Sequence, residues 1–180
     1  MSVKSHKKDI SIIINEMKKR PLMLFKIKKM LKDNYKRNFN FNSKYYQGKN
    51  LIHYSIEYGL NGLITPCIKY GCNPNICDDN YFSPLHLAVA KSNIKAVKIL
   101  LKNGVDVDIP GEFEQTPLHL AVICGNLSTI KLLIKYNADI TMVDEKNLSI
   151  LEYAIDEKNK KIIDYLEKKC KLKKGEKNVS

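Results

Sequence analysis

The chain has 180 residues and a formal net charge of +12, and 44% of its residues are hydrophobic. This apolar content is ordinary for a folded protein and excludes wholesale disorder. No apolar run approaches the roughly 18 residues that a membrane span requires, and the N-terminus lacks the apolar core of a secretory signal, so we expect a cytoplasmic protein that could also enter the nucleus.

The first 49 residues are expected to form a divergent helical cap. Asp9 or Ser11 could begin a first helix. Pro21 can begin a second helix, because the first helical position needs no amide hydrogen. The apolar residues of these two helices are Ile12, Ile13, Met17, Leu24, Ile27, Met30 and Leu31.

Four segments at a spacing of 33 residues share one pattern. The hexapeptide Ser-Pro-Leu-His-Leu-Ala at 83–88 recurs as Thr-Pro-Leu-His-Leu-Ala at 116–121, and weaker matches begin at Asn50 and Ser149. Self-similarity at a fixed period of about 20–50 residues indicates a solenoid, in which each unit buries its apolar face against its neighbours.

Each unit is expected to contain two helices. Thr116 can cap the first helix through its hydroxyl, and Pro117 fits the first helical position. The second helix has an apolar face opposite a row of lysines, and Gly104 follows one such helix where a left-handed residue is favoured. In the first unit, Gly62 and Pro66 fall inside the second helix, so we expect it to be short or kinked and the softest point of the stack.

This pattern resembles the ankyrin repeat, whose units read Gly-x-Thr-Pro-Leu-His-x-Ala-Ala, followed by an apolar second helix and a Gly-Ala-Asp turn. The resemblance covers residues 50 to about 168 and implies an all-α solenoid of stacked helix pairs with β-hairpin fingers. It also implies a structural role for His53, His86 and His119, each bonding its own hairpin and cap. A zinc ion shared by these histidines is excluded, because successive repeats lie on the order of 10 Å apart.

The resemblance divides the chain into successive units. Lys168-Lys169-Cys170-Lys171 fits a loose nuclear-import pattern, but short lysine runs are common in this sequence, and a tail that is only disordered is favoured. The expected units are the cap at 1–49, ankyrin repeats at 50–82, 83–115 and 116–148, a C-terminal capping repeat at 149–168 and a basic disordered tail at 169–180.

A recognition surface is also implied, built from fingers at 77–82, 110–115 and 143–148 and from exposed positions of the first helices. Apolar anchors rimmed by acid suit a protein-binding hot spot, and the alternative is that the finger aromatics only pack on one another. The acidic pairs Asp78-Asp79 and Asp144-Glu145 are expected to be surface turn residues rather than a carboxylate dyad. The candidate binding residues are Cys77, Asp79, Asn80, Phe82, Lys91, Glu112, Phe113, Gln115, Ile123, Cys124, Glu145, Lys146 and Leu148, with Tyr46, Lys49, Glu57 and Tyr58 in the first repeat.

The positive charge is concentrated at the two ends of the chain. Residues 1–49 hold 14 Lys and Arg against 3 Asp and Glu, whereas residues 50–157 hold 8 against 13. An acidic middle favours a protein partner that presents a basic segment. This resembles the way inhibitor-of-κB proteins hold Rel-type transcription factors, and short viral ankyrin proteins of parasitoid wasps are similar in size, so sequestration of an NF-κB factor is one alternative.

Nucleic-acid or chromatin binding through the basic ends is a second alternative. Duplex readers use arginine for bidentate base contacts, but only Arg20 and Arg37 accompany 29 lysines, which makes nucleic acid the less favoured partner.

No residue pattern indicates catalysis. The sequence has no nucleophile and histidine motif, phosphate-binding loop or zinc-protease signature. Five cysteines, an odd number without a Cys-x-x-Cys spacing, are typical of reduced thiols rather than of a disulfide framework or a metal site. We therefore expect a monomeric, non-enzymatic protein with no metal, no cofactor, no small-molecule substrate and no membrane contact.

Overall fold

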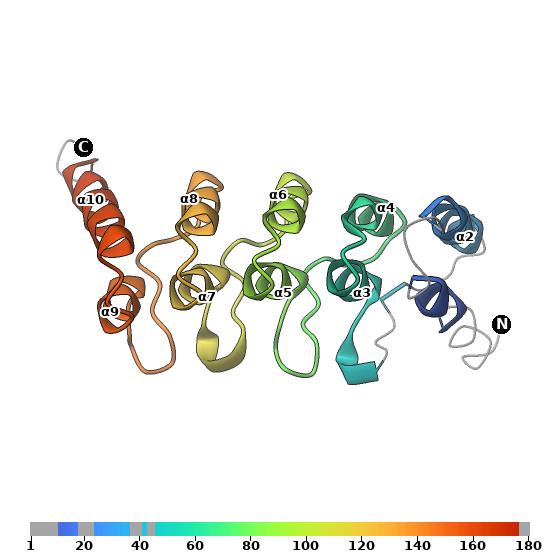
Figure 1. Cartoon of the computed structure of the whole chain (residues 1–180), viewed down its shortest axis with the longest axis horizontal. Helices are drawn as coiled ribbons and strands as arrows, with labels where there is room; N and C mark the ends of the chain where they lie inside the picture. The colour runs from blue at the N-terminus through green and yellow to red at the C-terminus, as the bar shows by residue number, and fades with distance from the viewer. Residues whose placement is uncertain (1–10, 18–23, 37–40, 43–45, 177–180) are drawn as a thin grey trace.

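The computed structural model describes residues 11–17, 24–36, 41–42 and 46–176, which form an elongated stack of helices (Figure 1). Within this part of the chain no strand occurs, and one isolated bridge joins Val143 to Ser149. Residues 11–17 form the first helix. The elements that follow are α2 (Leu24–Lys36), η2 (Tyr46–Gly48), α3 (Leu51–Glu57), η3 (Asn61–Leu63), α4 (Ile64–Lys69), α5 (Pro84–Ala90), α6 (Ile94–Lys102), η4 (Glu112–Glu114), α7 (Pro117–Ile123), α8 (Leu127–Lys135), α9 (Ile150–Asp156) and α10 (Lys160–Glu176).

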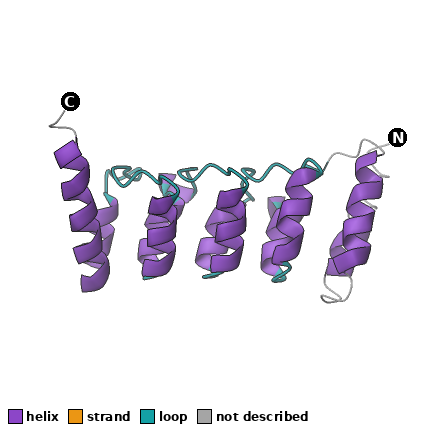
Figure 2. Cartoon of the chain, turned by 90° about the horizontal axis from the view of Figure 1, so that it is seen from above, coloured by secondary structure: helices purple, strands orange, loops and turns teal. Residues whose placement is uncertain are grey.

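The helices stack in two rows. Helices α3, α5, α7 and α9 form an inner row and α4, α6, α8 and α10 an outer row, so each repeat contributes one helix to each (Figure 1). Seen from above, the helix pairs lie side by side with the loops between repeats along one edge (Figure 2). These loops, the fingers, project beside the inner row. The prediction of an all-α solenoid of stacked helix pairs is confirmed.

Every inner helix begins with the same capping arrangement. The N-caps Asn50, Ser83, Thr116 and Ser149 lie 33 residues apart, and each takes part in a capping box. In such a box the cap side chain and the side chain of the third helical residue each satisfy a backbone N–H that the helix leaves unpaired. Pro117 follows Thr116 at the first helical position, as expected. The repeated caps therefore set the period of the inner row.

One continuous core lies between the two rows and between successive repeats. Ala88 and Ala121 are fully buried, and their small side chains let neighbouring inner helices approach closely. The lysines of the outer helices α6 and α8 are exposed, as their spacing predicted. Gly104 and Asn137, just past these helices, take φ angles of 71° and 68°. The core residues of the middle repeats are Leu85, Val89, Val97, Leu100, Leu101, Leu118, Val122, Ile130 and Leu133.

At the N-terminal end, residues 11–17 and α2 form a helix pair that continues the stack (Figure 1). Ile13 and Leu31 are fully buried in it, whereas Ile12 remains 44% exposed. Phe41, which the sequence did not single out, is also buried there. The proposed helix starts at Asp9 and Pro21 lie outside the described residues.

The outer helix of the first repeat is short, as predicted. Helix α4 has six residues, whereas α6 and α8 have nine each. Pro66 is its third residue, where the missing amide hydrogen disrupts no bond within the helix. The preceding turn is held to the next repeat by Asn61 and Asn93, whose side-chain amides exchange hydrogen bonds of 3.1 and 2.9 Å.

The C-terminal helix is longer than the sequence analysis predicted. A disordered tail was expected from residue 169, but α10 continues to Glu176, so that prediction is wrong for residues 169–176. Residues 177–180 lie outside the described part. The helix continues because Lys, Leu and Glu are good helix formers. The ammonium groups of Lys131 and Lys169 lie over the Tyr165 ring, 5.5 and 6.0 Å from its centroid.

Truncation of a buried outer-helix leucine tests the packing of the stack. Leu100→Ala should lower the free energy of unfolding by about 2–5 kcal/mol, because the side chain is fully buried and the cavity cannot fully collapse. Urea denaturation measures the change. Lys98→Ala, on the exposed side of the same helix, is the control and should cost less than about 0.5 kcal/mol. Equal losses in the two variants would contradict the assigned orientation of α6.

Candidate protein-binding surface

Two of the fingers are closed by a buried aspartate. The Asp78 carboxylate accepts hydrogen bonds from the backbone N–H groups of Asn80 and Phe82, at 2.9 and 3.0 Å. Asp144 holds residues 146 and 148 in the same way, at 2.9 Å each. Both aspartates are buried. The expectation of surface turn residues is therefore wrong for Asp78 and Asp144, whose carboxylates bond the turn from inside, whereas their neighbours Asp79 and Glu145 are exposed.

The finger at 110–115 has a glycine where the others have this aspartate. Gly111 donates its backbone N–H to the Gln115 carbonyl at 2.9 Å. A Cβ atom at this position would lie 2.9 Å from His86 Nε2 and 3.1 Å from the Gln115 carbonyl oxygen, which is too close. A glycine is therefore required where this finger packs on the histidine of the preceding repeat.

The three repeated histidines bond to the caps of their own helices, and His53 and His86 also link their helices to the finger that follows. His86 Nδ1 accepts a hydrogen bond from the Ser83 hydroxyl at 2.9 Å, and Nε2 donates to the Gln115 carbonyl at 3.0 Å. His53 Nε2 donates to the Phe82 carbonyl at 2.9 Å, and His119 Nδ1 accepts from its cap in the same way. Within the described residues, the buried Nε2 of His119 has no hydrogen-bond partner.

Burial keeps these histidines neutral. It lowers the pKa of His53 and of His119 below 6.5, and it lowers the pKa of His86 to about 4. A charged imidazole would also turn the accepting Nδ1 into a donor that faces the N–H of its own cap. The bonds to cap and finger thus require the uncharged ring.

The fingers are joined in pairs. The Asp79 N–H donates to the Gln47 carbonyl at 3.0 Å, and the Glu145 N–H donates to the Phe113 carbonyl at 3.1 Å. In the described part of the chain, no backbone hydrogen bond joins the fingers at 77–82 and 110–115. Between these two lies a small cavity of about 40 Å³, lined by Tyr81, Phe82, His86, Glu112, Gln115 and Leu120.

The structure distributes the predicted binding residues between the surface and the packing of the fingers. Phe82 is half-buried, with its ring edge-on to His86 at 6.0 Å, so it supports the finger as well as facing solvent. Gln115 is half-buried too. The exposed candidates are Asp79, Asn80, Lys91, Glu112, Phe113, Cys124, Glu145, Lys146 and Leu148, whereas Cys77, Phe82, Gln115 and Ile123 are half-buried.

Two tyrosines near the fingers were missed by the sequence reasoning. The Tyr153 hydroxyl donates to Asp144 at 2.7 Å and accepts from the Gln115 side chain at 2.8 Å, which ties two fingers to α9. The sequence did contain a signal for the role of Tyr153. This residue lies 33 residues after Leu120, so it places a hydroxyl group at a position that is apolar in the preceding repeat. Tyr81 is 64% exposed beside the cavity between fingers.

The exposed edge of the fingers is acidic. Asp79, Glu112, Glu114 and Glu145 are all exposed there, and Lys146 is the basic residue among the three fingers at 77–82, 110–115 and 143–148. Phe113, at 52% exposure, lies among these acids. The surface thus combines negative charge with exposed aromatic rings, which suits recognition of a partly basic protein segment.

Other kinds of site find no support in the part of the chain that the structure describes. No group of three or more His, Cys, Asp and Glu side chains is placed to hold a metal ion. Among the described helices, none has the length and apolar character needed to cross a bilayer.

Comparison with known proteins identifies the class to which the fold belongs. A family model for three copies of the ankyrin repeat matches residues 23–111, and a second model for ankyrin repeats matches residues 100–154. The chain belongs to the ankyrin-repeat family. Ankyrin repeats are protein–protein interaction modules and are generally non-enzymatic.

Two curated zebrafish (Danio rerio) proteins are similar over part of the chain. One carries the name of a palmitoyltransferase, ZDHHC13, and is 36% identical over 59 residues, which are 33% of this chain and 9% of that protein. The other is named neurogenic locus notch homolog protein 1 and is 28% identical over 76 residues, 42% of this chain and 3% of that protein. The chain thus spans less than a tenth of the length of either relative.

The neutral histidines predict a pH-dependent stability. The folded pKa of His86, about 4, lies below the unfolded value of 6.5, so its contribution is complete above pH 6.5 and is lost as the pH falls toward 4. From pH 7 to pH 5 the free energy of unfolding should fall by about 2 kcal/mol for this residue. Urea denaturation across this range measures the loss. His86→Gln should be less stable at pH 7 but flatter with pH, and an unchanged slope would contradict the assignment.

Proposed function

We propose that the chain is a non-enzymatic binding module whose finger face holds a partly basic segment of another protein. The finger face comprises the fingers at 77–82, 110–115 and 143–148 and the exposed positions of the inner helices beside them. The observation that carries this proposal is the row of exposed acids on these fingers with an exposed aromatic ring among them. Such a surface steers a basic partner by its charge and anchors it by its rings.

The centre of this surface is the gap between the fingers at 77–82 and 110–115. Tyr81 and Phe113 belong to the two fingers that flank it, and both rings are more than half exposed. Neither ring has a core position that would explain its presence. The acids Asp79 and Glu112 lie on the same two fingers. An apolar side chain next to a basic residue in the partner fits this combination.

The cysteines fit a reducing compartment for this activity. None of the five, which all lie in the described residues, takes part in a disulfide, and Cys124 is exposed. Disulfides are rare in the cytosol and the nucleus, where thiols are kept reduced. We therefore extend the proposal to a cytoplasmic protein that also enters the nucleus. An inhibitor-of-κB type of sequestration would be one instance of this function.

Affinity purification with quantitative mass spectrometry tests the proposal. The double variant Tyr81→Ala and Phe113→Ala should reduce the recovery of specific partners about tenfold or more, because it removes two central anchors. The matched control is Lys98→Ala with Lys135→Ala, two exposed outer-helix positions that should leave recovery unchanged. Unchanged recovery with the finger variant would overturn the proposed surface.

Nucleic-acid binding through basic α10 is tested in parallel. Four of its described lysines, Lys160, Lys161, Lys168 and Lys171, are exposed. If they were the functional surface, a fluorescent DNA duplex would bind with an affinity that falls steeply with salt. Changing these four lysines to glutamine would then abolish that binding, whereas the finger variant would not. We expect instead that the finger variant reduces the recovery of partners and that the lysine variant does not.

A further inference from the structure

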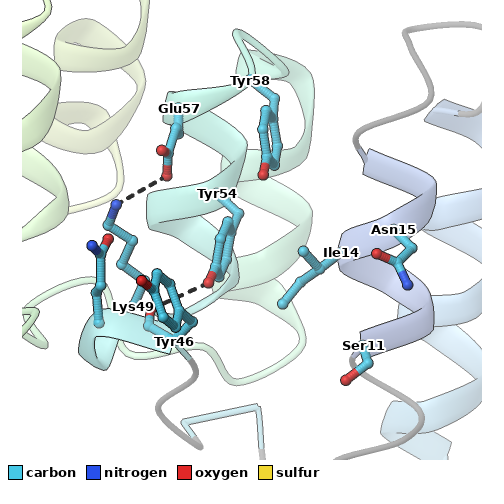
Figure 3. Close-up of a pocket in the computed structure, with 9 residues that line it drawn as sticks. Ser11, Ile14, Asn15, Tyr46, Lys49, Tyr54, Glu57 and Tyr58 are labelled. Atoms are coloured by element: carbon cyan, nitrogen blue, oxygen red, sulfur yellow. Dashed lines mark hydrogen bonds and ion pairs between the residues drawn. The ribbon is translucent and has the colours of Figure 1, made fainter.

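An open pocket lies at the N-terminal end of the inner row. It has a volume of about 450 Å³ and is lined by residues of the helix at 11–17, the η2 turn and α3, and by Lys49 between them (Figure 3). Ile14 faces the pocket from the cap helix, opposite Tyr54 on α3 (Figure 3). The pocket therefore continues the finger face into the cap, at the first repeat.

Three tyrosines form the aromatic part of this pocket. Tyr54 and Tyr58 lie one turn apart on α3, and their rings stack at 6.1 Å between centroids with an angle of 17°. The Tyr54 hydroxyl donates to the backbone carbonyl of Tyr46 at 3.3 Å, which fixes the ring. Tyr46 itself is 79% exposed at the pocket rim. Tyr54 is buried, at 7% exposure, so it supports the half-buried ring of Tyr58, and an occupant that enters from solvent meets the rings of Tyr46 and Tyr58.

One acid and one base line the pocket, and they pair with each other. Lys49 Nζ lies 3.2 Å from Glu57 Oε2, with the two side chains 14% and 32% exposed. Within the described residues, the second carboxylate oxygen, Oε1, accepts no hydrogen bond. Burial raises the pKa of Tyr58, and the negative charge of Glu57 raises it further. The negative charge of Glu57 therefore still influences the tyrosine side of the pocket, although Lys49 pairs with this carboxylate.

We propose that this pocket binds the guanidinium group of an arginine in the partner segment, an inference that rests on the proposed function. A guanidinium is planar and weakly hydrated, so it stacks on tyrosine faces better than an ammonium does. Its fork of donors matches a carboxylate, and Glu57 offers the oxygen Oε1 that Lys49 does not contact. An anionic group would meet the carboxylate and the negative faces of the rings, with Lys49 already paired.

A titration with small probes tests this site without a known partner. The full chain, labelled with ¹⁵N, is titrated with Nα-acetyl-arginine methylamide and followed by NMR. Saturable shifts are expected at the amides of Tyr46, Glu57 and Tyr58. The citrulline analogue has the same shape without the charge, and its affinity should be lower by about fivefold or more. The lysine analogue should also bind more weakly than the arginine probe.

Matched variants separate the pocket from general charge effects. Glu57→Gln should weaken arginine binding about fivefold, whereas Glu167→Gln, an exposed acid of the outer helix α10, should leave it unchanged. Tyr58→Phe should retain binding because the ring remains, and Tyr58→Ala should lose it. Should Tyr58→Ala fail to fold, the spectrum will show this, and the half-exposed Glu57 still carries the test.

Several outcomes would overturn the assignment. These are the absence of saturable shifts up to about 50 mM probe, equal binding of the citrulline analogue, tighter binding of the lysine analogue, or preferential binding of Nα-acetyl-aspartate methylamide. Failure of the proposed function gives a different result: the Tyr81→Ala and Phe113→Ala variant retains its partners, while the arginine probe still binds to the pocket. The failure of one proposal can therefore be distinguished from the failure of the other.

Discussion

The stack depends on a bond that each of the first two repeats makes from a histidine to the finger that follows it. The neutral imidazole of His86 accepts from its own helix cap and donates to the Gln115 carbonyl, and His53 reaches the Phe82 carbonyl in the same way. One side chain thus fixes both where an inner helix begins and where the next finger lies. Because no single repeat can bury its apolar face, this registration must be right before neighbouring cores can meet.

The same registration has a consequence for the surface. Backbone bonds from Asp79 and from Glu145 join the fingers in two pairs, while the cavity beside Tyr81 separates the pairs. The fingers at 77–82 and 110–115 have no backbone hydrogen bond between them, so another molecule can bind in the gap between these two fingers. The exposed rings lie on the two fingers that border this interruption, which is why the surface has a centre and is not a uniform acidic strip.

The sequence was sufficient for what the period of 33 controls, because caps, apolar faces and solvated lysines depend on local spacing. It was insufficient where a role depends on a neighbour from another repeat. Phe82 lies at a surface position of the repeat pattern, yet it packs against His86. Tyr153 joins Asp144 to Gln115, a contact that spans 38 residues. The length of α10 was missed for another reason, since a lysine-rich segment is compatible with both helix and disorder until packing is known.

Charge also acquires a meaning only with the fold. The net charge of +12 suggests an electrostatic partner of opposite sign, yet the finger acids Asp79, Glu112 and Glu145 are exposed on a different surface from the lysines of the outer helices. A basic segment that follows the fingers toward the N-terminal cap would reach Glu57 and the tyrosines of the first repeat last. The acidic fingers would then set the direction of approach and the aromatic pocket its end point. Long-range charge and short-range stacking thereby act at successive points along one face.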